Sequence, residues 1–326
     1  MHVSIRHKSD FLSQWIGLTV GTGALVLAPI GLLVLGAREA AAQSDFSYIL
    51  AGLIVMVGSI LISVNYEFSS RAISPDWSLG LEKSLYTGMI SIVIGAVMTY
   101  GLSRHAGFSV IVAASIVGIL GGIVAGKYSS LVYCGAFVGM TSPSIFGSYL
   151  HVVGAAILAS FVWYLSRPMF RGMGGKLGTV AFVGVIILVL SGGYSVEQHH
   201  TTGLETLYLA IIYSVVGALG TYLLHTSGKT DNVIASATVG LIGGAVLPFI
   251  HASGELLAAS VFAASFAGMS TPERIPSSSW MASVGILSAV GVVYTTATKD
   301  GCGGLLGAIA FGSSLIIYGI VQLLRK

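Results

Sequence analysis

The sequence predicts an all-α integral membrane protein with about twelve transmembrane helices, arranged as two plus five plus five. Three observations predict it: an apolar composition, a series of apolar stretches of membrane-spanning length, and an internal repeat. Of the 326 residues, 55% are hydrophobic and only 8% are charged. Soluble domains carry about 25% charged residues, so this composition, with a mean hydropathy of +0.91, excludes a soluble globular protein.

Twelve apolar stretches can be drawn along the chain, each near the roughly 20 residues that cross the hydrocarbon core of a bilayer. The first is longer than the apolar region of a signal peptide, which has about 7–15 residues, so we expect a retained helix. A polar connector, residues 67–83, separates the first two stretches from the rest. The stretches cover residues 15–36, 48–66, 84–103, 108–126, 128–146, 149–165, 177–195, 205–225, 232–250, 255–270, 279–297 and 304–323.

An internal repeat accounts for every stretch after the connector. Residues 84–126 match residues 206–248 at an offset of 122 (206 − 84). Inserted residues then raise the offset to 129, at which Phe137 pairs with Phe266 (266 − 137). We therefore divide the chain into two N-terminal helices with the connector, a first repeat and a second repeat, over residues 1–83, 84–196 and 204–326.

Five crossings per repeat, an odd number, would place the second repeat upside down, an architecture found in many transporters. With a cytoplasmic N-terminus, 12 of the 15 lysines and arginines lie in the cytoplasm, as the positive-inside rule favours. The three outside are Arg38, Arg104 and Lys299 (15 − 3 = 12). In the strongest alternative, residues 128–142 and 255–270 are re-entrant and the repeats are parallel, but positive charge then divides almost evenly. We expect both termini in the cytoplasm and a prokaryotic inner membrane.

Two matched segments are the candidate binding residues. Proline removes a backbone donor and disfavours helix in the residue before it. An interrupted helix of this kind exposes carbonyl and hydroxyl oxygens, which suit Na⁺ or a hydrogen-bonding solute. Each segment could equally be the turn between two helices. We call them the first proline element (Gly139, Met140, Thr141, Ser142 and Pro143) and the second proline element (Gly268, Met269, Ser270, Thr271 and Pro272).

Other polar residues give weaker signals. The acidic residues fall in loops or at helix ends, so an intramembrane carboxylate is not expected. Cys134 and Cys302 have neither metal-ligand nor disulfide spacing. His151 and His251 are expected to be interfacial, and the doublet at 199–200 is weak support for a metal. The matched pairs Thr99-Tyr100 and Thr221-Tyr222 are expected to be structural.

Several function classes receive no support from the sequence. The net charge of +3 comes without a basic patch, so no nucleic-acid partner is expected. No nucleophile motif or nucleotide-binding loop is present, so we expect no enzyme and no cofactor, with Na⁺ as the one candidate ion.

The function expected is transport of a small neutral or weakly polar solute by a secondary transporter or facilitator, with Na⁺ coupling as one form. Its site would lie between the two proline elements. One alternative is a passive channel with its pore on the pseudo-twofold axis. Another is a scaffold or sensor subunit that transports nothing. Expected partners are the lipid bilayer, a small-molecule or ion substrate and, as one possibility, a second copy of the chain.

Overall fold

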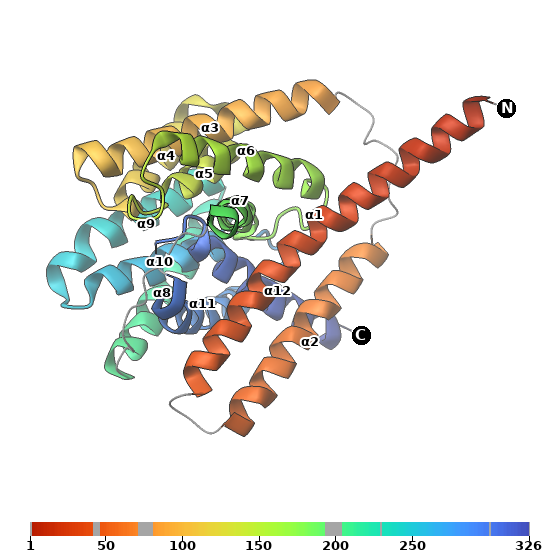
Figure 1. The fold of residues 1–326 in the computed structure, drawn as a ribbon. Helices are drawn as coiled ribbons and strands as arrows, with labels where there is room; N and C mark the ends of the chain where they lie inside the picture. Colours follow the sequence, from red (N-terminus) through yellow and green to blue (C-terminus); the bar gives the residue numbers. More distant parts are fainter. Residues whose placement is uncertain are drawn as a thin grey trace.

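The computed structural model describes residues 2–41, 46–70, 81–192, 204–228, 230–299 and 301–325, and all regular secondary structure in these ranges is helical. The predicted all-helical fold is therefore confirmed for these residues (Figure 1). Much of the connector, the junction between the two repeats and the histidine doublet lie outside the described residues. In chain order the elements are α1 (His2–Ala41), α2 (Phe46–Ser70), α3 (Leu81–Ala106), α4 (Val110–Val124), the 3₁₀ turn η2 (Gly126–Tyr128), α5 (Ser129–Gly139), α6 (Tyr149–Ser166), α7 (Lys176–Gly192), α8 (Leu204–Thr226), α9 (Asn232–Ile250), α10 (Gly254–Gly268), α11 (Ser278–Lys299) and α12 (Leu305–Leu324).

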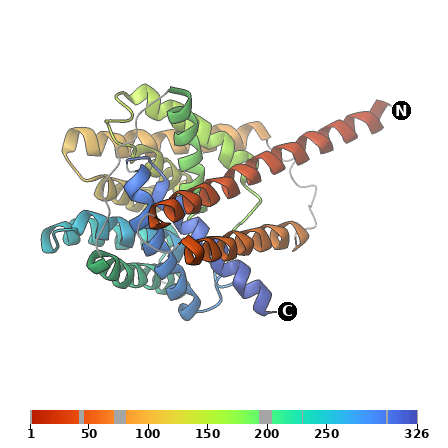
Figure 2. The same cartoon turned by 60° about the horizontal axis from the view of Figure 1, so that its bottom comes forward.

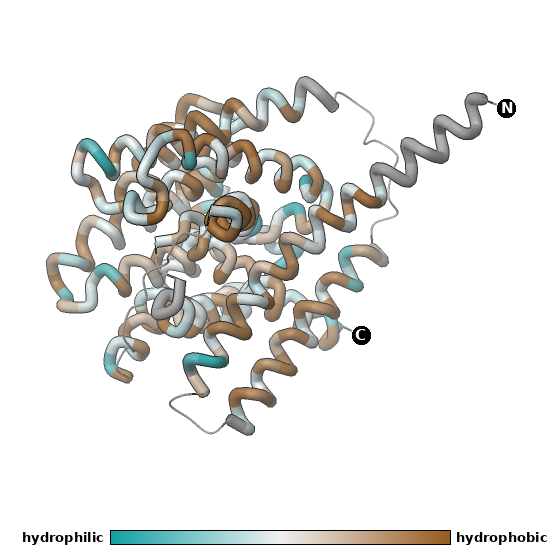
Figure 3. The backbone as a smooth tube through the Cα atoms, in the orientation of Figure 1, coloured by the Kyte–Doolittle hydropathy of each residue, from teal (hydrophilic) through white to brown (hydrophobic). Residues whose placement is uncertain are grey.

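Eight of the described helices are long and apolar enough to cross a membrane: α1, α2, α3, α6, α8, α9, α11 and α12. Three more, α4, α7 and α10, are apolar but shorter. Hydrophobic residues predominate along the helices, most plainly on α1 and α2 (Figure 3). The chain is thus a multi-pass integral membrane protein.

The largest departure from the predicted stretches is α5. The sequence predicts a helix over residues 128–146, but α5 has 11 residues and ends at Gly139. At 1.5 Å per residue it is about 16 Å long, roughly half the depth of a hydrocarbon core. Its last backbone bond joins the Met140 N–H to the Ala136 carbonyl at 3.1 Å. Beyond it, Pro143 lacks the N–H that a continuing helix would need.

Helices at matched positions begin in the same way. The Ser109 hydroxyl caps α4 by accepting a bond from the Val112 N–H at 3.3 Å. The Asp231 carboxylate caps α9 by accepting from the Val233 N–H at 2.9 Å. Both side chains satisfy a donor that the first turn of a helix leaves free. The two caps are 122 residues apart (231 − 109), the offset of the repeat in this part of the sequence.

The helices α4 and α9 pack against each other in opposite directions. Gly122, near the end of α4, faces Ile234 near the start of α9. Ile111, near the start of α4, faces Gly244 towards the end of α9. Residue numbers therefore rise along one helix while they fall along the other, which means that the pair is antiparallel.

The helices α7 and α12 cross in the same manner, and they approach more closely. A Cβ atom added to Gly178 would lie 2.5 Å from the Cα atom of Gly307. On one side of this crossing Gly175 meets Phe311, and on the other Gly304 meets Phe182. Two backbones can come this near only where neither residue has a side chain, as is common in membrane helix pairs.

The two N-terminal helices lie side by side against the rest of the bundle (Figures 1 and 2). α2 follows α12, where the Ser63 hydroxyl donates to the Leu315 carbonyl at 2.6 Å. α1 crosses α6 at Gly21, where a side chain in place of the glycine hydrogen would overlap Leu165. Helices α1 and α2 therefore contact both of the five-helix units that the sequence predicts.

Candidate functional site

The first proline element forms the turn that joins α5 to α6. Gly139 ends α5, Met140 caps it, and Ser142 and Pro143 lie in the turn that follows. Thr141 is buried, and its hydroxyl donates to the Val138 carbonyl at 2.8 Å. The same oxygen accepts a bond from the Gly303 N–H at 3.2 Å. The turn is therefore fastened to the loop that precedes α12.

The second proline element is built in the same way between α10 and α11. Gly268 ends α10, Met269 caps it, and Thr271 and Pro272 begin the turn. The buried Ser270 hydroxyl donates to the Ala267 carbonyl at 2.8 Å and accepts from the Gly174 N–H at 2.9 Å. This turn is fastened to the loop that precedes α7.

Each proline element thus pairs with a loop of the other predicted repeat. We call residues 172–175 the first glycine loop and residues 301–304 the second glycine loop. The backbone N–H of Ser142 donates to the Gly301 carbonyl at 2.8 Å, and that of Thr271 donates to the Gly172 carbonyl at 2.9 Å. Gly172 and Gly301 have φ values of 75° and 82°, which glycine adopts without the steric cost that other residues meet.

Two matched tyrosines bond the turns that follow the proline elements. The Tyr100 hydroxyl donates to the Phe146 carbonyl, and the Tyr222 hydroxyl donates to the Ile275 carbonyl at 2.8 Å. Their neighbours Thr99 and Thr221 pack against Gly139 and Gly268, and both threonine hydroxyls are buried without a hydrogen-bond partner. The sequence predicts a structural role for these pairs, but their contact with the proline elements is visible only in the structure.

Aromatic rings meet between the two proline elements. The rings of Phe137 and Phe266, each two residues before its glycine, have centroids 4.5 Å apart. Tyr133 and Phe262 occupy matched positions one turn earlier and pack on the same pair, at 4.3 Å from Phe137 and Phe266 respectively.

One edge of this aromatic cluster carries hydroxyl groups. The hydroxyls of Tyr133 and Ser236 are 3.4 Å apart, and those of Ser236 and Ser265 are 3.0 Å apart. These rings and hydroxyls are buried and pack against one another.

A buried ion pair that the sequence does not predict joins α2 to the turn that precedes α11 and to the loop between α6 and α7. The Glu67 side chain is 0% exposed, and its oxygens accept from the Arg274 guanidinium at 2.7 and 3.1 Å. The Phe170 N–H also donates to Glu67, at 2.6 Å. Arg274 further donates to the Arg171 carbonyl and the Tyr318 hydroxyl. Glu67 was classed as a residue at a helix end, and nothing in its sequence neighbourhood signals a distant arginine.

The pKa values around the ion pair follow its geometry. Burial works to lower the pKa of Arg274, but its hydrogen bonds and attraction to Glu67 outweigh burial and raise that pKa above the ordinary value. The neighbouring Glu273 is fully exposed, and a hydrogen bond from Thr271 lowers its pKa. Arg274 is therefore a permanent cation at physiological pH.

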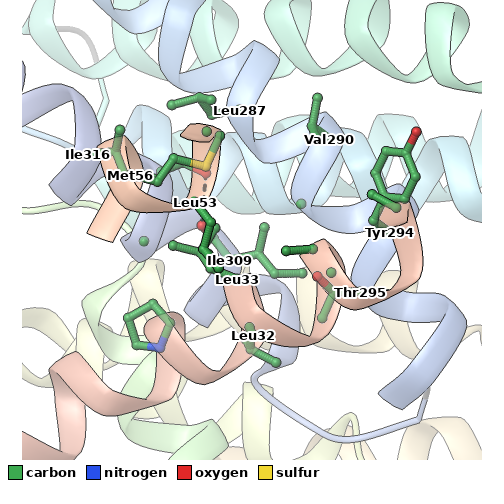
Figure 4. Close-up of a pocket in the computed structure, with 18 of the residues that line it drawn as sticks. Leu32, Leu33, Leu53, Met56, Leu287, Val290, Tyr294, Thr295, Ile309 and Ile316 are labelled. Carbon is green, nitrogen blue, oxygen red and sulfur yellow. Dashed lines mark hydrogen bonds between the residues drawn. The ribbon is translucent and has the colours of Figure 1, made fainter. Parts of the chain in front are cut away.

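A cavity of about 300 Å³ lies between α1, α2, α11 and α12 (Figure 4). Its lining is apolar except for three hydroxyl-bearing residues, Tyr294, Thr295 and Ser313. The Ser313 hydroxyl is turned back to the Ile309 carbonyl of its own helix, at 3.0 Å. The cavity lies outside both proline elements and was not predicted.

The remaining candidates are structural in the described part of the chain. The His151 ring bonds the Ser148 hydroxyl at 2.9 Å, and the His251 ring bonds the Tyr213 hydroxyl at 2.8 Å. Cys134 and Cys302 are buried and form no disulfide bond with each other. Within the described residues no three His, Cys, Asp or Glu side chains gather in a way that could hold a metal ion.

Fold and hydropathy define the class of the chain as a multi-pass membrane protein. Comparisons with protein-family models, with curated proteins and with solved structures each found no match.

Proposed function

We propose that the chain is a membrane transport protein built from an inverted-topology repeat, with residues 84–196 and 204–326 as its two units. The antiparallel packing of α4 on α9 and of α7 on α12 supports this proposal. A twofold axis along the membrane normal would make matched membrane-spanning helices parallel, whereas an axis in the membrane plane makes them antiparallel. Inverted repeats of this kind surround a central site in many transporters.

One observation carries the proposal: the two proline elements close in matching fashion on the opposite repeat's glycine loops. We call the contacts of Thr141 and Ser142 with the second glycine loop the first latch. The contacts of Ser270 and Thr271 with the first glycine loop are the second latch. In an inverted repeat the two latches face opposite sides of the membrane, so opening one while keeping the other gives alternating access.

The strength of the latches suits such an exchange. Each has two inter-repeat hydrogen bonds, and a net value of roughly 0.5–1.5 kcal/mol per bond gives about 1–3 kcal/mol per latch. A difference of a few kcal/mol keeps both states of a two-state protein accessible.

The solute would bind near the aromatic cluster, between the two proline elements. Its surroundings there are the rings of Phe137, Phe262 and Phe266 and the hydroxyls of Tyr133 and Ser236. Neutral hydroxyls and ring faces favour a small neutral or weakly polar solute, because a bare charge would be costly at this depth. Na⁺ would bind only through neutral oxygens of the proline elements.

The inversion is tested by labelling two introduced cysteines from each side of the membrane. Ser144 follows the first proline element and Ser277 follows the second. In Ser144→Cys and Ser277→Cys variants, a membrane-impermeant maleimide is expected to reach one from outside and the other from inside. The native Cys134 and Cys302 are buried, which keeps the background low. Reaction of both variants from the same side would refute the inverted arrangement.

Transport itself is tested in proteoliposomes with a panel of small neutral solutes, with and without a Na⁺ gradient. Thr141→Val and Ser270→Ala each remove a latch hydroxyl and are expected to impair flux. Ser160→Ala is the matched control, because that buried hydroxyl bonds only the Ala156 carbonyl of its own helix, at 2.7 Å. Unchanged flux in both latch variants, and in Ser142→Ala and Thr271→Ala, would show that the proline elements are not the transport site.

The same vesicles separate the competing functions. A carrier shows faster uptake when the opposite side is preloaded with solute, whereas an open pore on the pseudo-twofold axis does not. A scaffold or sensor subunit would show no flux under any gradient and would purify as a stoichiometric complex with another protein.

A further inference from the structure

The cavity between α1, α2, α11 and α12 lies within the part of the protein that lipid surrounds. All four helices are candidate membrane spans. Leucine, isoleucine, methionine and small residues dominate the lining, as Figure 4 shows for Leu32, Leu53, Met56, Ile309 and Ile316. A volume of about 300 Å³ equals roughly ten water molecules at about 30 Å³ each, but an apolar cavity stays dry and accepts apolar guests.

The dimensions of the cavity match one leaflet. Along α1 the lining begins at Pro29 and ends at Ala40. This distance corresponds to about 16 Å at 1.5 Å per residue, roughly half of a hydrocarbon core about 30 Å thick. The deep end is closed where Gly312 packs on Pro29. The cavity thus has the depth of a single acyl chain.

Two of the three hydroxyl-bearing residues lie at one end, whereas Ser313 adjoins Gly312 at the other end and its hydroxyl bonds its own helix. Tyr294 and Thr295 flank the shallow end, opposite Ile316 and Met56 (Figure 4). Thr295 lies next to Gly36, in the last turns of α1. Arg38 is exposed two residues further on, and Glu39 follows it with the opposite charge. An amphiphile would place its chain in the cavity and its headgroup beside these residues.

We propose that the cavity is a binding site for one acyl chain of a bilayer phospholipid, which enters from the leaflet in which α1 ends. The adjacent opposite charges of Arg38 and Glu39 select no particular headgroup, so the apolar chain is the recognised part. The site holds the N-terminal helices α1 and α2 to α11 and α12 through a lipid.

The test uses the full-length protein in phosphatidylcholine vesicles that contain a small fraction of phospholipid with a photoactivatable diazirine at mid-chain. Cross-links are mapped by mass spectrometry. We expect labelling of the lining residues Met56 and Ile309 to exceed that of Ile54 and Val55, which are 63% and 61% exposed on the lipid-facing side of α2. Labelling confined to Ile54 and Val55 would show that lipid only surrounds the protein, and would overturn the proposal.

A matched pair of variants on α2 provides the second arm. Gly52 lines the cavity, Gly58 does not, and a Cβ atom added at either meets nothing within 4 Å. Gly52→Leu fills part of the cavity and excludes the chain, so the labelling of Ile309 should be lost. Gly58→Leu should label like the wild type. Equal labelling in all three proteins would overturn the proposal. If Gly52→Leu does not fold, the wild-type comparison of the lining residues with Ile54 and Val55 decides it.

Discussion

The buried pair of Glu67 and Arg274 gives the sharpest prediction about stability. Glu67 is fully buried and the Arg274 side chain is 11% exposed, so water screens the pair weakly. Arg274→Met would leave the carboxylate without its cation, which typically costs about 3–5 kcal/mol. Glu67→Gln keeps an oxygen for the Phe170 N–H, but it leaves the guanidinium buried beside a neutral amide.

The double variant should be less destabilised than the two single variants together. With both charges removed, no uncompensated charge remains in the protein interior, and replacing a buried pair by neutral groups is often close to neutral. We therefore expect the sum of the two single costs to exceed the double cost by about 2 kcal/mol or more. The measurement is the free energy of unfolding in mixed micelles titrated with SDS, for the wild type and all three variants.

A neighbouring carboxylate supplies the control. Glu273 precedes Arg274 in sequence but is fully exposed, so a cycle of Glu273→Gln with Arg274→Met should be additive. If the Glu67 cycle is also additive to within about 0.5 kcal/mol, the burial argument is wrong and the ion pair contributes no more than a surface contact.

Three further predictions concern packing and buried polar groups, each measured by the same unfolding titration. Gly178→Ala should destabilise the protein by about 1–3 kcal/mol because its Cβ would overlap Gly307. Gly154→Ala is the control, because its Cβ meets only an ordinary contact and the variant should be neutral or stabilising. Equal effects of the two substitutions would contradict the close crossing. Thr221→Val should be neutral or stabilising, since the threonine hydroxyl is buried without a partner, and a clear loss of stability would reveal a hydrogen bond there. Lys176→Met should cost about 2 kcal/mol or more, because three carbonyls at and just after the end of α6 lose a charged donor that lies 2.5–3.2 Å away. An unchanged stability would show that water replaces it.

The proline elements show which features of a site a residue pattern can predict and which it cannot. The match between residues 139–143 and 268–272 identified both segments, and proline chemistry predicted a helix interruption or a turn there, although the stretch predicted over residues 128–146 runs past the end of α5 at Gly139. The pattern left open whether the hydroxyls of Thr141 and Ser270 are free. They are occupied, because Gly303 and Gly174 supply N–H groups from loops more than ninety residues away. Such partners cannot be predicted locally, since the distance along the chain carries no information about distance in space.

The ion pair and the cavity show the same limit in a different form. Glu67 and Arg274 are 207 residues apart, and each alone looks like a solvated charge at a helix end. The cavity is lined by residues of four helices that are far apart in the sequence, α1, α2, α11 and α12.

Composition and hydrophobic periodicity determined by themselves that the chain is helical and lies in a membrane, because a backbone in lipid must satisfy its own hydrogen bonds. Repetition in the sequence also predicts which helices correspond. Tertiary structure alone decided that α5 has only 11 residues, which helices pack against each other, and which buried groups have partners. These features depend on the free energy of contacts between distant segments, and that free energy is defined only once the helices have packed.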